Sequence, residues 1–286
     1  MKKTAAALLA SGLFAQAALA DNLQFHTYNP QENSIFPVTS VIVEGDKEVL
    51  LVDAQFQRND AEALVQQIRA TGKPLKTVYI SHYDPDFYFG LDVIRQAFPQ
   101  AEILATPETL AHIEDSIIGK YKFWSPILKE NAPQMLVLPK ATKAAHLNVG
   151  SSRLEIRGQN INPSLTYLWD PQSKTVLGGV ALYEGTHLWL ADSQTAEARS
   201  KWAKTLNDIA AQKPKRVIPG HFIGTPSVKT IAFNQQYLKA VEQADKTTRT
   251  GSEMATKLQQ AFPQLKGAQD LELGAKVVKG EEKWPK

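Results

Sequence analysis

The chain has 286 residues, of which 43% are hydrophobic and 21% are charged, and its formal net charge is +3. This composition is typical of a globular protein with one large core or two coupled halves. A charge so close to neutral gives no reason to expect nucleic acid or anionic lipid as a partner. Because cysteine is absent, thiolate nucleophiles and cysteine-ligated metals are excluded.

The first twenty residues have the pattern of a secretory signal peptide. Lys2 and Lys3 give a basic start, an apolar stretch follows, and residues 18–20 read Ala-Leu-Ala. We expect cleavage between Ala20 and Asp21 and a location in the bacterial periplasm or outside the cell. A membrane anchor is the alternative, but the apolar stretch is too short to span a bilayer comfortably, and no later stretch is long enough.

The first half of the chain alternates strands and helices. The elements expected there are strands at 38–44, 48–53, 76–80 and 101–105, and helices at 60–70 and 91–98. A longer helix begins after Thr106, a good N-cap, with Pro107 in its first turn. It runs to about residue 130, either continuously or with a break at Gly119. Its segment 120–127 is rich in aromatic residues, which places it at the rim of a pocket or against another helix.

The second half repeats this order. The elements expected there are strands at 135–138, 153–157, 166–169, 175–177 and 216–218, and helices at 195–211, 227–246 and 252–262. The last twenty residues are charged and are predicted to be irregular, with Trp284 as the one side chain that would anchor them. Since no linker interrupts the two similar halves, we expect one domain whose sheets are covered by helices.

A cluster of metal-capable side chains follows a buried strand of the first half. His82, Asp84 and Asp86 alternate, so an extended or tightly turning segment brings them to one side. Imidazole and carboxylate groups suit zinc, manganese or iron, and the carboxyl end of a strand is where α/β proteins place active sites. In the second half, His221 follows a strand in the same way. The plainer alternatives are that His82 bonds to backbone, that the aspartates form only a turn around Pro85, and that His221 is a loop residue.

Residues 81–90, which read Ser-His-Tyr-Asp-Pro-Asp-Phe-Tyr-Phe-Gly, resemble the His-x-His-x-Asp-His motif of the metallo-β-lactamase superfamily. His82 matches the first histidine, Asp84 stands in place of the second, and Asp86 matches the aspartate. Phe87 replaces the last histidine. The resemblance extends from about residue 40 to about residue 240. It implies an α/β fold, an αβ/βα sandwich of two mixed β-sheets flanked by helices, with domain bounds of 21–250 and a C-terminal helical extension and tail at 251–286.

Two other segments carry the resemblance, and two expected ligands are missing. Asp53 ends a strand similar to the one that carries a supporting aspartate in the family. Residues 218–221, which end in His221, are similar to the strand that delivers the last histidine ligand. Gln159 and Gly179 stand where the family has a histidine and an aspartate, so the chain is similar to a divergent member with an incomplete ligand set.

The retained residues imply a site for one divalent metal, zinc in the first place, with manganese or iron as alternatives. Its ligands would be His82, Asp84, Asp86 and His221. The implied function is an exported hydrolase in which metal-activated water attacks a small ester, lactone or amide, with Asp86 as the candidate catalytic general base. Phe87 would keep the site dry and block a second metal.

Two other functions stay open. The missing ligands favour a degenerate, non-catalytic periplasmic binding or interaction protein of the same fold. Hydrolysis without a metal, with Asp84 or Asp86 as the base, is the third hypothesis. His187 and Asp192 are candidates for rebuilding the missing part of the site, although a histidine beside a tryptophan more commonly only packs.

Overall fold

The computed structural model describes residues 22–284. The signal peptide at residues 1–20 and its cleavage site lie outside the described residues, so both stay predictions. Within the described part of the chain, no helix is both long enough and apolar enough to cross a membrane.

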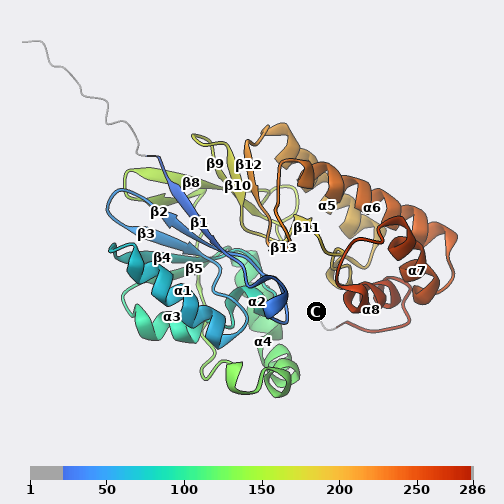
Figure 1. The fold of residues 1–286 in the computed structure, drawn as a ribbon, viewed down its shortest axis with the longest axis horizontal. Helices are drawn as coiled ribbons and strands as arrows, with labels where there is room; N and C mark the ends of the chain where they lie inside the picture. Colours follow the sequence, from blue (N-terminus) through green and yellow to red (C-terminus); the bar gives the residue numbers. More distant parts are fainter. Residues whose placement is uncertain (1–21, 285–286) are drawn as a thin grey trace, which may run out of the picture.

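Two mixed sheets and a small third sheet form the centre of the molecule (Figure 1). Their strands are β1 (Gln24–Tyr28), β2 (Ser40–Glu44), β3 (Val49–Val52), β4 (Leu75–Ile80), β5 (Glu102–Ala105), β6 (Lys140–Ala141), β7 (His146–Val149), β8 (Ser152–Arg157), β9 (Tyr167–Asp170), β10 (Thr175–Leu177), β11 (Tyr183–Glu184), β12 (Arg216–Ile218) and β13 (His221–Phe222). The first sheet has the order β1-β2-β3-β4-β5-β6, and the second has the order β12-β10-β9-β8-β7. Strands β3 to β6 are parallel, so their carboxyl ends meet at one edge.

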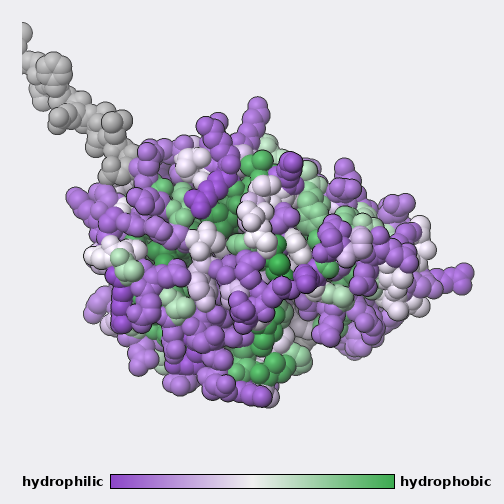
Figure 2. Space-filling view, viewed as in Figure 1, coloured by the Kyte–Doolittle hydropathy of each residue, from purple (hydrophilic) through white to green (hydrophobic). Residues whose placement is uncertain are grey.

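Helices surround the two sheets (Figure 1). They are α1 (Arg58–Ala70), α2 (Pro85–Tyr88), α3 (Leu91–Ala97), α4 (Pro107–Leu128), α5 (Ala196–Ala211), α6 (Lys229–Thr247), α7 (Gly251–Ala261) and α8 (Ala268–Val278). Helices α1 and α3 lie beside the first sheet, and α5 and α6 lie on the side of the second. Polar side chains cover most of the face in Figure 2, and apolar side chains reach the surface near α4.

Alternating side chains of the strands build two apolar cores. In β3, Leu51 belongs to the larger core, which also contains Leu64 of α1. Its neighbours Leu50 and Val52 belong to a smaller core, which contains Leu168 of the second sheet. This period of two separates a core under the helices from a core between the sheets. The predicted αβ/βα sandwich is therefore confirmed.

Two expected elements differ from the structure, and a third, the long helix, follows one of its two alternatives. Residues 135–138 form no strand: Met135 and Leu138 are exposed, whereas Leu136 and Val137 are partly buried against the larger core. Helix α4 continues through Gly119, where a side chain would meet open space. The tail that was expected to be irregular contains α8, which buries Leu271 and packs against α7.

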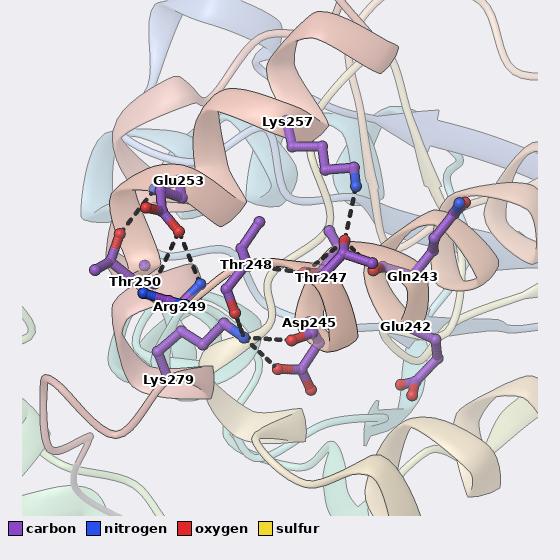
Figure 3. Close-up of polar contacts among 12 residues, drawn as sticks. Glu242, Gln243, Asp245, Thr247, Thr248, Arg249, Thr250, Glu253, Lys257 and Lys279 are labelled. Atoms are coloured by element: carbon purple, nitrogen blue, oxygen red, sulfur yellow. Dashed lines mark hydrogen bonds and ion pairs between the residues drawn. The ribbon is translucent and has the colours of Figure 1, made fainter.

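Polar contacts hold the C-terminal helices together (Figure 3). Lys279 follows α8 and reaches the C-terminus of α6, where its ammonium group donates to Thr248 O at 2.9 Å and to the backbone and carboxylate oxygens of Asp245. A cation is favourable at this end of a helix because the last carbonyl groups are unpaired. Helix α7 begins with a capping box between Thr250 and Glu253. These contacts fix the position of α8, which lines a cavity described below.

Replacing Lys279 with Met keeps the length of the side chain but removes the cation from the end of α6. Hydrogen bonds to charged groups contribute roughly 1.5–3 kcal/mol, so we expect the free energy of unfolding to fall by about 1–2 kcal/mol in urea denaturation. Lys257→Met, which loses one exposed bond to Thr247, is the matched control and should change it by less than about 0.5 kcal/mol. Equal losses in the two variants would contradict this account.

Candidate functional site

The predicted cluster lies at the carboxyl edge of the first sheet, directly after β4. Asp84 precedes α2, Pro85 is its first residue, and Asp86 lies in its first turn. His82, Asp84 and Asp86 are all buried, with 2%, 9% and 5% of their surfaces exposed. Buried polar side chains need partners inside the protein, so the partners define what this cluster can do.

The carboxylate of Asp84 is paired with an ammonium group from α4. Lys120 Nζ lies 3.1 Å from Asp84 Oδ1 and donates a second hydrogen bond to Tyr83 O at 3.2 Å. His82 completes the group, since its Nδ1 lies 3.3 Å from Asp84 Oδ2. Burial acts to raise the pKa of Asp84, but Lys120 and His82 outweigh burial and hold this pKa well below its usual range. Asp84 is therefore an ionised carboxylate whose charge is already balanced.

A second pair joins the two halves of the chain. Asp86 Oδ2 lies 2.6 Å from His221 Nε2, although 135 positions separate the two residues. The imidazole of His221 stacks on the ring of Tyr183, with the centroids 5.1 Å apart and the planes 7° from parallel. Its Nδ1 has no hydrogen-bond partner. The meeting of the two halves at His221 follows the expectation, but only Asp86 bonds to it.

Phe87 packs against both histidines. Its ring centroid lies 5.3 Å from the imidazole of His82 and 5.3 Å from that of His221, edge-on in each case. The four predicted ligands thus form two separate pairs that border one aromatic ring. In the described range, no group of three or more His, Cys, Asp or Glu residues is arranged to hold a metal ion.

The residues as arranged do not fit the single metal ion that the sequence predicts. A catalytic zinc uses at least three protein ligands, whereas each pair offers two. Asp84 already bonds to Lys120, and Asp86 already bonds to His221. The geometry therefore does not reproduce one ion shared by all four predicted ligands. The physical reason is the ammonium of Lys120, which brings a positive charge to the buried Asp84.

Ser81 links strand ends from the two sheets. Its Oγ donates to Asp53 Oδ2 at 2.6 Å and accepts from the backbone N–H of Gly179 at 2.7 Å. Its own N–H donates to Asp53 Oδ1 at 2.8 Å, so Asp53 is the supporting residue that was expected. Gly179 has a φ of +71°, and a Cβ there would lie 2.0 Å from Thr166 O. The backbone thus excludes a side chain at the position of the missing aspartate.

Gln159 and His187 do not rebuild the cluster. Gln159 lines neither of the two cavities described below, and Asn162 lines the first of them. His187 is buried, with Nδ1 2.7 Å from the hydroxyl of Tyr237 and Nε2 without a partner. Burial lowers the pKa of His187 to about 4, so its imidazole is neutral at neutral pH.

Two cavities border the Asp84–Lys120 pair. The first has a volume of about 310 Å³ and the second about 150 Å³. Both are lined by Asp84, Lys120, Tyr183 and Trp189. The first is lined mostly by polar side chains, whereas the second combines six Phe, Tyr and Trp side chains with several polar ones. Phe123 and Trp124 line the second, so segment 120–127 borders a pocket, which is one of the two positions left open for it.

The role of Lys120 was not predicted from the sequence. This lysine lies on the buried stripe of α4, together with Ile113, Ser116 and Ile117. A lysine on the apolar stripe of a helix requires a buried partner, and this spacing was the available signal. The partner, Asp84, is 36 positions away and could not be read from the helix itself.

Trp284 anchors the end of the described chain, as expected. Its Nε1 donates to Asp192 Oδ1 at 3.1 Å, and Trp189 donates to the other oxygen of Asp192. The two indole rings meet edge to face with their centroids 5.0 Å apart. Burial and the nearby charge of Asp84 raise the pKa of Asp192 to about 7. Asp192 therefore fastens the tail to the wall of the first cavity.

Comparison with known proteins decides the family. Residues 34–221, well over half of the chain, match the metallo-beta-lactamase superfamily. The chain belongs to the metallo-beta-lactamase superfamily. A stretch of 71 residues is 32% identical to the uncharacterised protein YobT of Bacillus subtilis (strain 168), and it covers 25% of this chain and 30% of YobT.

Solved structures of the superfamily share the fold at low sequence identity. A metallo-beta-lactamase family protein from Thermus thermophilus aligns with a TM-score of 0.63 and 16% identity, over 90% of this chain and 91% of that one. The DIM-1 metallo-beta-lactamase aligns with a TM-score of 0.54 and 19% identity, over 77% and 94%. At such identities the similarity establishes the fold and leaves the chemistry to the residues described above.

The buried carboxyl group of Asp53 makes stability depend on pH. Burial raises its pKa to about 8, with Asp86 adding to the effect and the bonds from Ser81 opposing it. Because the folded pKa exceeds the unfolded value of 3.8, the folded state holds a proton that the unfolded chain loses. This group therefore makes the free energy of unfolding fall as the pH rises from about 4 to about 8.

Asp53→Asn cannot ionise, and asparagine tolerates the positive φ found at this position. We expect the variant to lose a slope of up to about 1.4 kcal/mol per pH unit, measured by urea denaturation across this range. Asp115→Asn, an exposed change on α4, is the control and should keep the slope of the native protein. Parallel curves for the native protein and Asp53→Asn would contradict the assignment.

Proposed function

We propose that this protein is an exported member of the metallo-beta-lactamase superfamily that binds a small molecule and works without a bound metal ion. The binding alternative from the sequence thus takes precedence over the metal-dependent hydrolase. The observation that carries the proposal is the ion pair between Lys120 and Asp84. A lysine ammonium stands where the hydrolase hypothesis needs a metal ion to balance that carboxylate.

The energetics of a buried ion pair support this proposal. Removing one partner of such a pair costs roughly 3–5 kcal/mol, because the other charge is left uncompensated. A metal ion that displaced Lys120 from Asp84 would leave this ammonium group uncompensated, and one that bound the other oxygen of Asp84 would lie beside the ammonium group and be repelled by it. A metal ion held by Asp86 Oδ2 and His221 Nε2 would have to break the 2.6 Å contact between these two atoms.

The two cavities give a small molecule a place to bind. Cavities of a few hundred Å³ with apolar walls and a few convergent polar groups are typical of small-molecule sites. Here the apolar walls include Tyr183 and Trp189, and the polar groups include the Asp84–Lys120 pair. A ligand in either of the two cavities would lie against the Asp84–Lys120 pair.

Hydrolysis is the second candidate, and the contact between Asp86 and His221 favours it. A carboxylate on Nε2 orients the imidazole and leaves Nδ1 as the atom that could take a proton from water. The substrate would be the small ester, lactone or amide proposed from the sequence. The version with zinc, manganese or iron on His82, Asp84, Asp86 and His221 stays a prediction that the next experiment decides.

Metal content separates these functions. We expect natively purified protein to contain well under one equivalent of zinc, manganese or iron, and added zinc to leave the melting temperature unchanged. Metal that binds the folded state would raise this temperature by mass action. One equivalent of zinc, with a thermal shift that both His82→Ala and His221→Ala abolish, would contradict the proposal and support the metal-dependent hydrolase.

The same protein is assayed on a panel of small esters, lactones and amides. The binding proposal expects no turnover above buffer. Turnover that resists a chelator and is lost in Asp86→Asn would instead favour the second candidate, because that change removes the carboxylate from His221.

Export is part of the proposal and has its own test. In a bacterial host, the basic start and the small residues before Ala20 should direct cleavage after that residue. We expect intact mass spectrometry of the protein from the periplasmic fraction to give a chain that begins at Asp21. A cytoplasmic protein that retains residues 1–20 would contradict it.

A further inference from the structure

The second cavity has an aromatic wall. Its aromatic lining residues are Phe36, Phe123, Trp124, Tyr183, Trp189 and Trp284. The wall draws on segments far apart in the sequence, from the stretch before β2 to the end of the described chain. Trp284 is held in place by its bond to Asp192 and by its edge-to-face contact with Trp189. Such a wall offers flat apolar surface and the negative faces of several rings.

The charge of this cavity is negative. Asp270, in the first turn of α8, lines it and makes no hydrogen bond or ion pair with any described residue. Asp86 is a second carboxylate in the lining. Lys120 is the cation in the lining, and Asp84 already balances it at 3.1 Å. An anionic ligand would therefore be repelled, whereas a cationic ligand would find an unpaired carboxylate.

Three buried polar side chains of the same lining have an atom without a hydrogen-bond partner among residues 22–284. They are Thr186, His187 and His221, with 7%, 3% and 8% of their surfaces exposed. The atoms are Thr186 Oγ1, His187 Nε2 and His221 Nδ1. Unpaired buried polar atoms are uncommon in folded proteins, and three around one cavity point to a ligand that supplies hydrogen bonds.

We propose that the second cavity binds a small organic cation, an ammonium group joined to a flat apolar body. The ammonium group lies beside Asp270, and the body packs against the aromatic wall. An ammonium group donates hydrogen bonds, and Asp270 and the unpaired ring nitrogens can accept them. The ring faces add cation–π attraction. The inference rests on the proposed function, because a metal ion at Asp86 and His221 would reverse the charge of the cavity.

Three ligands that share one aromatic ring and differ in charge test this proposal directly. Benzylamine, benzyl alcohol and benzoate share the aromatic ring and are cationic, neutral and anionic at neutral pH. Binding to the full chain is measured by calorimetry and by quenching of the tryptophan fluorescence, since three of the wall residues are tryptophans. We expect benzylamine to bind about tenfold or more tighter than benzyl alcohol and benzoate to bind weakest. Equal affinities, preference for benzoate, or no binding of benzylamine would overturn the inference.

Asp270→Asn locates the cation. This change keeps the shape of the side chain and removes its charge, so we expect the affinity for benzylamine to fall about tenfold while that for benzyl alcohol is retained. Glu272→Gln, two residues further along α8 and paired only with Lys276, is the matched control and should bind as the native protein does. An unchanged affinity in a folded Asp270→Asn protein would overturn the inference. If the variant does not fold, the charge series on the native protein decides alone.

Failure of this inference is distinguishable from failure of the proposed function. A metal-free protein that shows no preference for the cation loses the ligand assignment and keeps the metal-independent function. A protein that holds one equivalent of zinc loses the metal-independent function, whatever it binds in the aromatic cavity.

Discussion

The contact on which this structure depends is the buried ion pair between Lys120 and Asp84. It ties the longest helix of the described chain to the turn after β4, and it lies where the two cavities meet. A buried pair of this kind adds little to stability in itself, but neither partner can be removed without leaving an unpaired charge. The pair therefore fixes the position of α4 and sets the charge on both sides of it.

Other contacts near the cluster join the two halves of the chain. Ser81 connects the end of β4 to Asp53 and to Gly179 of the second half through three hydrogen bonds. Phe87 fills the space between two imidazoles with a ring that cannot bind metal. Gly179 leaves no room for a carboxylate, because Thr166 O occupies the place of its Cβ. The backbone at Gly179 and the ring of Phe87 thus take the places of two of the usual ligands, whereas the fold of the superfamily is kept.

The sequence predicted the parts of the molecule that follow local patterns. The strands expected at 48–53 and 76–80 correspond to β3 and β4, and the family motif located the cluster at the end of β4. Such local patterns could not predict which side chains pair with one another inside the cluster. Lys120 reaches Asp84 from another element, and its role depends on the crossing of α4 over the strand ends.

Two further misses have different causes. Residues 135–138 have the composition of a strand, but Met135 faces solvent, so composition alone was misleading. Helix α8 lies among charged residues that hid its apolar stripe, which includes Leu271 and Ala275. Because α8 was not expected, Asp270 was not recognised either, although the ligand proposal depends on its carboxylate.

The most direct test of the central claim is a crystal structure of the protein, purified without chelator and soaked in zinc, with data collected at the zinc absorption edge. The account predicts that Lys120 Nζ remains within hydrogen-bond distance of Asp84 and that no anomalous peak lies near His82, Asp86 or His221. An anomalous peak bonded to these side chains, with Lys120 turned away from Asp84, would contradict it.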